Sequence, residues 1–163
     1  MEIALGGSIQ NIVTDNEQTA KRMIEFLKKN KFGRATFLPL TQIRSHGGIA
    51  QPQALKEEGV IGLADTLVMV EDKYLELAGS LLGRTLVVDH IDHGLAIARK
   101  YRQSIRIVTL EGDLINPGGS MTGGAFKNSS NLLSRRREIE ELEQADPKLR
   151  ADVAKTEQEI AEL

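Results

Sequence analysis

The densest run of side chains that could bind a metal or transfer protons is Asp89-His90-Ile91-Asp92-His93. A metal-dependent phosphohydrolase would need further ligands from elsewhere, and the third histidine, His46, lies in a stretch with the composition of a linker. The structural alternative is a strand end followed by a helix cap, with both histidines exposed to solvent. We favour this alternative and expect no metal and no cofactor, and a metal-dependent enzyme stays as the rival function.

A second candidate for chemistry is the glycine-rich stretch 111–126. A phosphate-binding P-loop needs Gly-x-x-x-x-Gly-Lys-[Ser/Thr]; Gly119 and Gly124 have this spacing, but Ala125 replaces the lysine. A dinucleotide-binding turn would need a helix directly after the glycines, and none is expected there. The sequence therefore predicts neither a nucleotide site nor catalytic residues, and no ATPase activity, in this chain.

The same stretch contains two glycine pairs, Gly118-Gly119 and Gly123-Gly124. Without a Cβ, these residues permit positive φ and let another backbone approach closely. Beside strand-like residues they indicate a sheet edge that pairs with, or packs tightly against, a second chain. A flexible surface loop is the alternative, and the residues alone leave both interpretations open.

The composition fits a folded chain without a membrane segment. With 163 residues, 40% of them hydrophobic, the chain can bury one core or two small lobes. No apolar run approaches the ~18–20 residues of a membrane span, and the N-terminus lacks the features of a secretory signal. Cysteine is absent, which excludes disulfides and thiolate metal sites. We therefore expect a cytoplasmic protein without membrane contact.

A diverged internal repeat predicts the architecture. Residues 7–38 and 83–110 both contain an apolar β-branched run, an acid, an amphipathic helix and a second strand. Such strand–helix–strand units favour parallel strands, so we predict a mixed α/β (α+β) fold of two related lobes with mixed sheets flanked by helices. The predicted strands are 12–14 and 34–38 in the first copy, and 86–88 and 105–110 in the second.

Capping and apolar periodicity place the helices of the repeat. In the first copy, Asp15 and Gln18 form a predicted capping box, and in the second copy Asp92 is the predicted cap. The apolar stripe is stronger in the first copy than in the second, where the helix is expected around residues 95–101. The stripe residues are Ala20, Met23, Ile24 and Leu27 in the first copy, and Leu95, Ala98 and Tyr101 in the second.

The segments before the two copies differ in length. Residues 67–70 predict a strand before the second copy, followed by a helix with apolar residues at Tyr74, Leu77, Ala78 and Leu81. Before the first copy, only residues 2–6 resemble the tail of an equivalent helix. Part of the first lobe is therefore expected to be missing. Residues 44–53, with Gly47-Gly48 and Pro52, have the composition of a mobile linker.

The C-terminal residues predict a coiled-coil helix with an interruption. A heptad places Leu132, Ile139, Asp146, Val153 and Ile160 at position a, and Leu142, Leu149, Thr156 and Leu163 at position d. Pro147 is expected to break or kink this helix, with Asp146 capping a new one. The partner helix of the seam is not evident in this chain.

Two long motifs carry a family resemblance. The run 106–124, Arg-Ile-Val-Thr-Leu-Glu-Gly-Asp-Leu-Ile-Asn-Pro-Gly-Gly-Ser-Met-Thr-Gly-Gly, resembles the hinge domain of bacterial or archaeal structural-maintenance-of-chromosomes (SMC) proteins. The run 32–40, Phe-Gly-Arg-Ala-Thr-Phe-Leu-Pro-Leu, is similar to a second hinge signature. The resemblance implies a hinge cut inside its first lobe, with residues 1–43 as the rest of that lobe, 44–58 as linker, 59–130 as second lobe and 131–163 as the start of a coiled-coil arm.

The resemblance also implies a homodimer and a mechanical function. Two hinges would join two arms and help a chromosome condensation and segregation complex, associated with the nucleoid, to capture DNA. The ATP-binding heads and the kleisin subunit that binds them would lie outside this chain. An unrelated regulatory dimerisation module is a further alternative. The implied interface residues are Gly118, Gly119, Ser120, Met121, Thr122, Gly123 and Gly124.

Basic residues suggest a DNA surface. Residues 138–163 carry nine acids and three bases, which is a charge of −6. Because the net charge of the whole chain is −2, the other residues together carry +4. Basic side chains near helix C-termini complement the helix dipole, which is an ordinary structural explanation. Their repetition in both copies, together with the family resemblance, predicts sequence-independent binding to DNA phosphates. The candidate residues are Lys28, Lys29, Arg102, Arg106, Arg135, Arg136 and Arg137.

Overall fold

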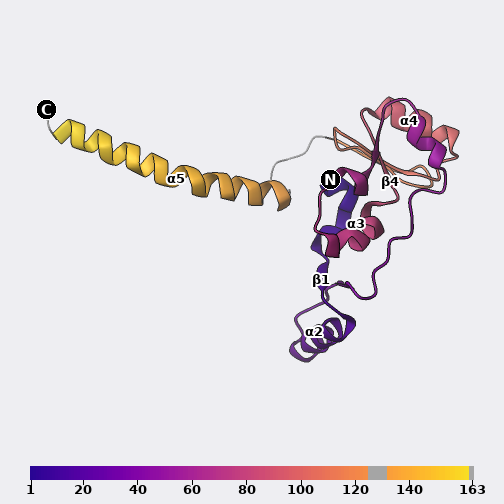
Figure 1. The fold of residues 1–163 in the computed structure, drawn as a ribbon, viewed down its shortest axis with the longest axis horizontal. Coiled ribbons are helices and arrows are strands. Elements are labelled where there is room, and N and C mark those ends of the chain that lie inside the picture. Colours follow the sequence, from indigo (N-terminus) through magenta and orange to yellow (C-terminus); the bar gives the residue numbers. More distant parts are fainter. Residues whose placement is uncertain (125–131, 162–163) are drawn as a thin grey trace. The chain divides into compact units, whose positions relative to one another are not determined.

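The computed structural model describes residues 1–124 and helix α5 (Leu132–Ala161), with the side chains of α5 described at residues 139–151, 153, 155 and 156. The chain divides into two compact units, Met1–Ala125 and Phe126–Leu163. Figure 1 shows the first unit as helices packed around a sheet, and the second as a single long helix. The predicted mixed α/β class is confirmed.

The first copy of the repeat forms the strand–helix–strand unit that the sequence predicts. Strands β1 (Ile12–Thr14) and β2 (Phe37–Pro39) pair in parallel, and helix α2 (Glu17–Asn30) connects them. The predicted cap is wrong by one residue, since Asn16, in extended conformation, accepts a hydrogen bond from Thr19 N at 2.9 Å. Of the apolar stripe, Ala20 is buried, but Met23 and Ile24 are 42% and 40% exposed.

The second copy repeats this topology in a more buried setting. Strands β4 (Thr85–Val88) and β5 (Arg106–Thr109) are parallel, and helix α4 (Ile91–Lys100) joins them. The cap is again not the predicted acid, because the His90 ring accepts from Asp92 N at 3.4 Å. The strands of both copies therefore agree with those predicted from the sequence, whereas the cap residues of both helices differ from the predicted ones.

These strands belong to a five-stranded mixed sheet of order β3-β4-β5-β6-β7. The outer strands are β3 (Val60–Leu63), β6 (Leu114–Ile115) and β7 (Met121–Thr122), each antiparallel to its neighbour. The predicted strand 67–70 is wrong. The strand beside β4 forms earlier in the chain, and the helical turn η3 (Ala64–Leu67) follows it and leaves Met69 fully exposed.

Helices cover both faces of this sheet. On one face α4 packs against Leu86, Val88 and Ile107. On the other face, α1 (Glu2–Leu5) and α3 (Leu75–Leu82) pack against Val87 and Val108. Strand alternation thus sends neighbouring residues of β4 into two different cores. The N-terminal helical residues are confirmed as helix, and they pack on the sheet that contains the second copy.

The segment predicted as a linker has specific contacts with α3 and with the core of the second copy. Residues 44–51 contain no helix or strand, and η2 (Pro52–Lys56) follows. Ser45 N donates to Glu76 Oε2 at 2.7 Å, and a Cβ on Gly79 would lie 2.5 Å from Ser45 Oγ. Ala54 is fully buried in the core beneath α4. This segment therefore packs on α3 through Ser45 and on the core of the second copy through Ala54.

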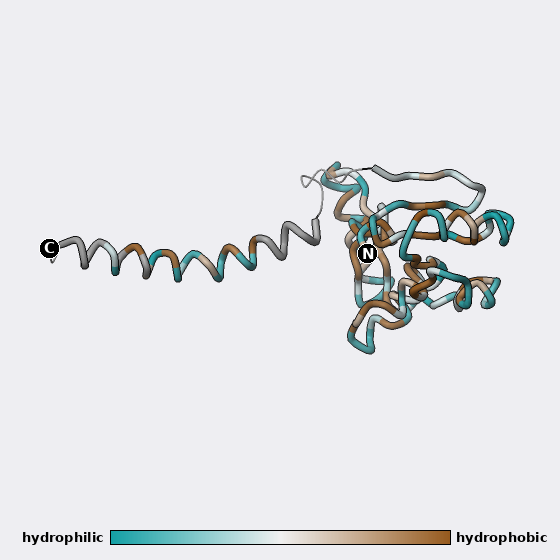
Figure 2. The backbone as a smooth tube through the Cα atoms, turned by 90° about the horizontal axis from the view of Figure 1, so that it is seen from above, coloured by the Kyte–Doolittle hydropathy of each residue, from teal (hydrophilic) through white to brown (hydrophobic). Residues whose placement is uncertain are grey.

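Helix α5 runs through Pro147 as one 30-residue helix, so the predicted break is not present. Asp146 accepts from Arg150 at 2.8 Å, one turn away, where the sequence predicted a cap. Figure 2 shows hydrophobic and hydrophilic residues alternating along this helix. The described seam residues are exposed, as a coiled-coil seam is before it meets its partner; they are Ile139, Leu142, Leu149 and Val153.

Candidate functional site

The glycine-rich stretch forms the last hairpin of the sheet, between β6 and β7. Its turn closes with a hydrogen bond from Gly119 N to Asn116 O at 3.0 Å, and Pro117 and Gly118 occupy the central positions. Gly118 has φ 89°, as the second central residue of a type II turn requires. Asn116 N also donates to Ser120 O at 2.9 Å. The proline and glycine pattern therefore encodes a defined turn.

Beyond the turn, β7 is the edge of the sheet. All the predicted interface residues, 118–124, are exposed, and Met121 is 52% exposed. Among the described residues, no strand pairs with the outer edge of β7. Exposed edges of this kind accept a strand from another chain.

Gly123 is required where β7 ends. A Cβ at this position would collide with the Asp113 carboxylate, which accepts a hydrogen bond from Thr109 Oγ1 at 3.1 Å, and Asp113 N donates to the same hydroxyl at 2.9 Å. Asp113 is a supporting residue that the sequence reasoning missed, since an acid beside a glycine is also common in ordinary turns. The end of the edge strand therefore packs against a side chain that is held in place by hydrogen bonding.

The predicted DNA-binding residues do not gather at one place in the described structure. Lys28 and Lys29 are exposed at the end of α2, and Arg102 is exposed just after α4. Figure 1 shows α2 and α4 at opposite ends of the first unit. The side chains of Arg135, Arg136 and Arg137 lie outside the described residues.

Arg106 has a structural contact instead of a free position. It is partly buried, and its guanidinium donates to Ile3 O of α1 at 3.3 Å. Its Nε is buried without a partner among the described residues. In this structure Arg106 therefore holds α1 on the sheet.

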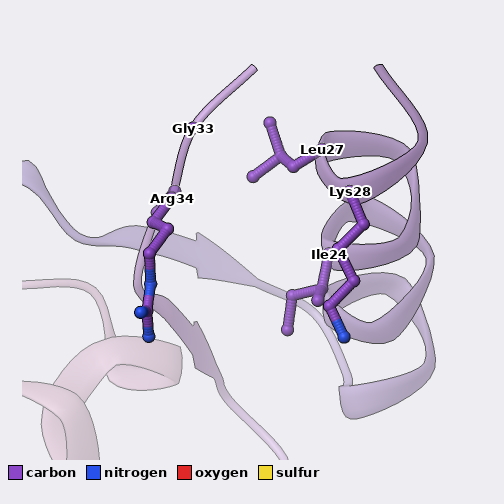
Figure 3. A pocket seen from close by; sticks show the side chains of 6 residues that line it. Ile24, Leu27, Lys28, Gly33 and Arg34 are labelled. Carbon is purple, nitrogen blue, oxygen red and sulfur yellow. The ribbon is translucent and has the colours of Figure 1, made fainter. Parts of the chain in front are cut away.

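A pocket of about 550 Å³ lies beside α2. Figure 3 shows Ile24 and Leu27 pointing from the helix toward the segment that carries Gly33 and Arg34. Its lining is apolar apart from two cations, so it could hold an apolar group with an anionic end; the lining residues are Ile24, Leu27, Lys28, Gly33, Arg34 and Ala35.

The Asp89–His93 cluster has the geometry of a helix start. Asp89 Oδ1 lies 2.7 Å from His93 Nδ1 and accepts from His90 N at 2.6 Å. Asp89 raises the pKa of His93 and His93 lowers that of Asp89, because each stabilises the charged form of the other. No cluster of three metal-binding side chains occurs in the part of the chain that the structure describes. The geometry does not favour the metal-dependent enzyme.

A hairpin with an open edge, a two-copy strand–helix–strand fold and a long exposed seam agree with the predicted hinge. The family model for the flexible hinge domain of SMC proteins matches residues 1–98. The chain belongs to the SMC hinge family. The resemblance based on the two sequence motifs is thereby confirmed.

Relatives of this hinge chain are chromosome partition proteins. It is 44% identical to the Smc protein of Desulfitobacterium hafniense (strain Y51) and 42% identical to that of Bacillus subtilis (strain 168), in each case over the whole chain. It spans 13% and 14% of the length of these two proteins.

Solved hinge structures share its fold. The asymmetric dimer of the Geobacillus stearothermophilus SMC hinge domain matches with a TM-score of 0.74 and 37% identity, over 96% of this chain and 64% of that one. The Pyrococcus furiosus Smc hinge domain with an extended coiled coil matches with a TM-score of 0.61 and 30% identity, over 93% and 52% of the two chains. The hinge-like architecture is therefore confirmed. The described helices include none with the length and apolarity of a membrane span.

Proposed function

We propose that this hinge chain forms a homodimer through the edge of β7 and the glycine turn before it. The open, ordered edge of the sheet carries this proposal. The Geobacillus stearothermophilus hinge domain forms an asymmetric dimer in its crystal structure, which supports dimerisation here as well. Residues 118–124 would supply main-chain hydrogen bonds, and the two glycine pairs on either side of the exposed Met121 would let the second chain approach closely.

In the whole protein, the dimer would join two coiled-coil arms of a chromosome partition protein. The exposed seam of α5 supports this, because it needs a partner helix to cover it. ATP hydrolysis, the kleisin subunit and association with the nucleoid would belong to the complete complex. This chain would contribute the mechanical joint and no catalytic group.

Replacing all four glycines of residues 118–124 with alanine tests the dimer. Three of them have positive φ and the fourth would clash with Asp113, so the edge should shift and the mass from light scattering should fall toward that of a monomer. The matched control is Gly33→Ala with Gly47→Ala. These residues also have positive φ but no atom near an added Cβ. A monomeric parent, or a variant that keeps the dimer mass, would refute the proposal.

We also propose sequence-independent contact with DNA phosphates. The exposed lysines at the end of α2, the exposed Arg102 and the arginines at residues 135–137 support it, and Arg106 would contribute less because of its contact with α1. If the chain contacts about four phosphates, its affinity for DNA should fall on the order of a hundredfold when the salt concentration rises from 50 to 200 mM.

Charge reversal tests the DNA surface. We expect Lys28→Glu, Lys29→Glu and Arg102→Glu together to abolish most of the binding of duplex DNA at low salt. Lys73→Glu is the control, since Lys73 already pairs with Glu71 at 3.0 Å. Equal binding by the triple variant and the parent would mean that these residues are only helix-end charges.

A further inference from the structure

Helix α4 ends in an unusual backbone conformation. Both Arg102 and Gln103 lie in the left-handed region, with φ 54° and 51°. Residues other than glycine, asparagine and aspartate are disfavoured there, because their Cβ atom comes too close to the following carbonyl oxygen. Strained residues of this kind persist where the surrounding structure fixes them.

Ending a helix does not require two such residues. In the first copy of the repeat, α2 ends with Lys31 alone in this conformation, at φ 56°. Lys31 N closes the helix by donating to Lys28 O at 3.3 Å. Gln103 N also closes α4, by donating to Ala98 O at 2.6 Å. After α2, Phe32 N makes the equivalent bond to Leu27 O at 3.2 Å without a positive φ, so the left-handed conformation of Gln103 is not needed to end the helix and has another role.

That role is visible in the contacts of Gln103. Its carbonyl oxygen accepts a hydrogen bond from Gly118 N at 2.8 Å, at the centre of the glycine turn. Its side chain lies beside the turn as well, since a Cβ on Gly119 would be 3.7 Å from Gln103 Cδ. The loop after α4 thus holds the turn that leads into the edge strand.

We propose that Gln103 is a positioning residue for the homodimer. Its left-handed backbone directs its carbonyl at Gly118, and this bond fixes the turn and the start of β7 where a second copy of the chain can pair with the edge. The inference rests on the proposed dimerisation through β7. It adds a residue outside the hairpin that controls how the edge is presented.

Substitutions at Gln103 and Lys31 separate this role from helix termination. Valine disfavours the left-handed conformation strongly, whereas asparagine tolerates it. We expect Gln103→Val to weaken the dimer at least tenfold in sedimentation experiments and to speed hydrogen exchange at the Gly118 amide. Gln103→Asn should restore both values, and Lys31→Val should leave both at the parent level.

Each result has one meaning. A dimer of parent affinity in Gln103→Val, or equal weakening in Lys31→Val, would overturn the positioning role. If Gln103→Val does not fold, Gln103→Ala introduces milder strain and is measured instead. A monomeric parent would refute dimerisation itself, and Gly118 exchange in the same variants would still show whether Gln103 holds the turn.

Discussion

The two copies of the repeat have the same topology and very different surroundings. All four residues of β4 are buried, because neighbouring strands and helices on both faces enclose them. In β1 only Thr14 is buried, and Ile12 and Val13 are 43% and 40% exposed. The local sequence pattern is thus enough to specify strand, helix and parallel strand. Burial depends on how many other elements pack around the unit.

The largest expected difference between the copies is in how much their equivalent apolar residues contribute to the free energy of unfolding. Leu86, fully buried in β4, corresponds to Ile12 in β1. We expect Leu86→Ala to lower the free energy of unfolding by about 2–5 kcal/mol, and Ile12→Ala by less than about 1 kcal/mol. Urea denaturation of both variants measures the two losses. Equal losses would show that the Ile12 surface is covered in solution.

The helix caps provide a smaller test. Asn16 caps α2 with a 2.9 Å hydrogen bond, whereas His90 caps α4 with a longer one of 3.4 Å. Asn16→Ala should cost about 1 kcal/mol of stability, and His90→Ala should cost less. Thermal unfolding compares the two variants. A larger loss at His90 would mean that α4 depends on its cap more than its buried contacts indicate.

The smallest effect is a pH dependence confined to the second copy. Asp89 raises the pKa of His93 above 6.5, with help from Glu58 and Asp92, and the pKa of Asp89 falls below 3.8. The His93 contribution is complete below pH 6.5 and disappears as pH rises through its raised pKa, while that of Asp89 disappears as pH falls through its lowered pKa.

Because both groups are partly exposed, the melting temperature should fall only slightly between pH 6 and pH 8.5. In the first copy Thr19 occupies the place of His93 and does not titrate. His93→Gln should therefore remove this part of the pH profile, measured by circular dichroism. An unchanged profile in that variant would assign the pH dependence to other groups.

Sequence reasoning was most successful where residues act locally. The β-branched runs predicted the strands of both copies, and the glycine pairs indicated a sheet edge, although the hairpin of β6 and β7 was not predicted. It was wrong at residues 67–70, because a short apolar run does not show which of two neighbouring segments will pair with β4. It also placed both caps on acids, although Asn16 and His90 are the residues in extended conformation before their helices.

The residues that support the candidate site could not be predicted from the sequence, for a different reason. The contact between Gln103 and Gly118 depends on the backbone of two loops that meet only in the folded sheet. Nothing in the type of residue 103 predicts a left-handed conformation, which glycine or asparagine would have signalled. Arg106 was similarly assigned to a basic surface, because the sequence does not show that α1 lies across it.

The bond between Arg106 and Ile3 also bears on the order in which the chain folds. The two residues are 103 positions apart, so α1 leaves the ribosome long before β5 exists. Its docking surface, formed by Val87, Val108 and α3, is complete only once β5 has paired with β4. Contacts of such long sequence separation form slowly. We therefore expect α1, which is synthesised before its docking surface, to be among the last elements of this unit to pack.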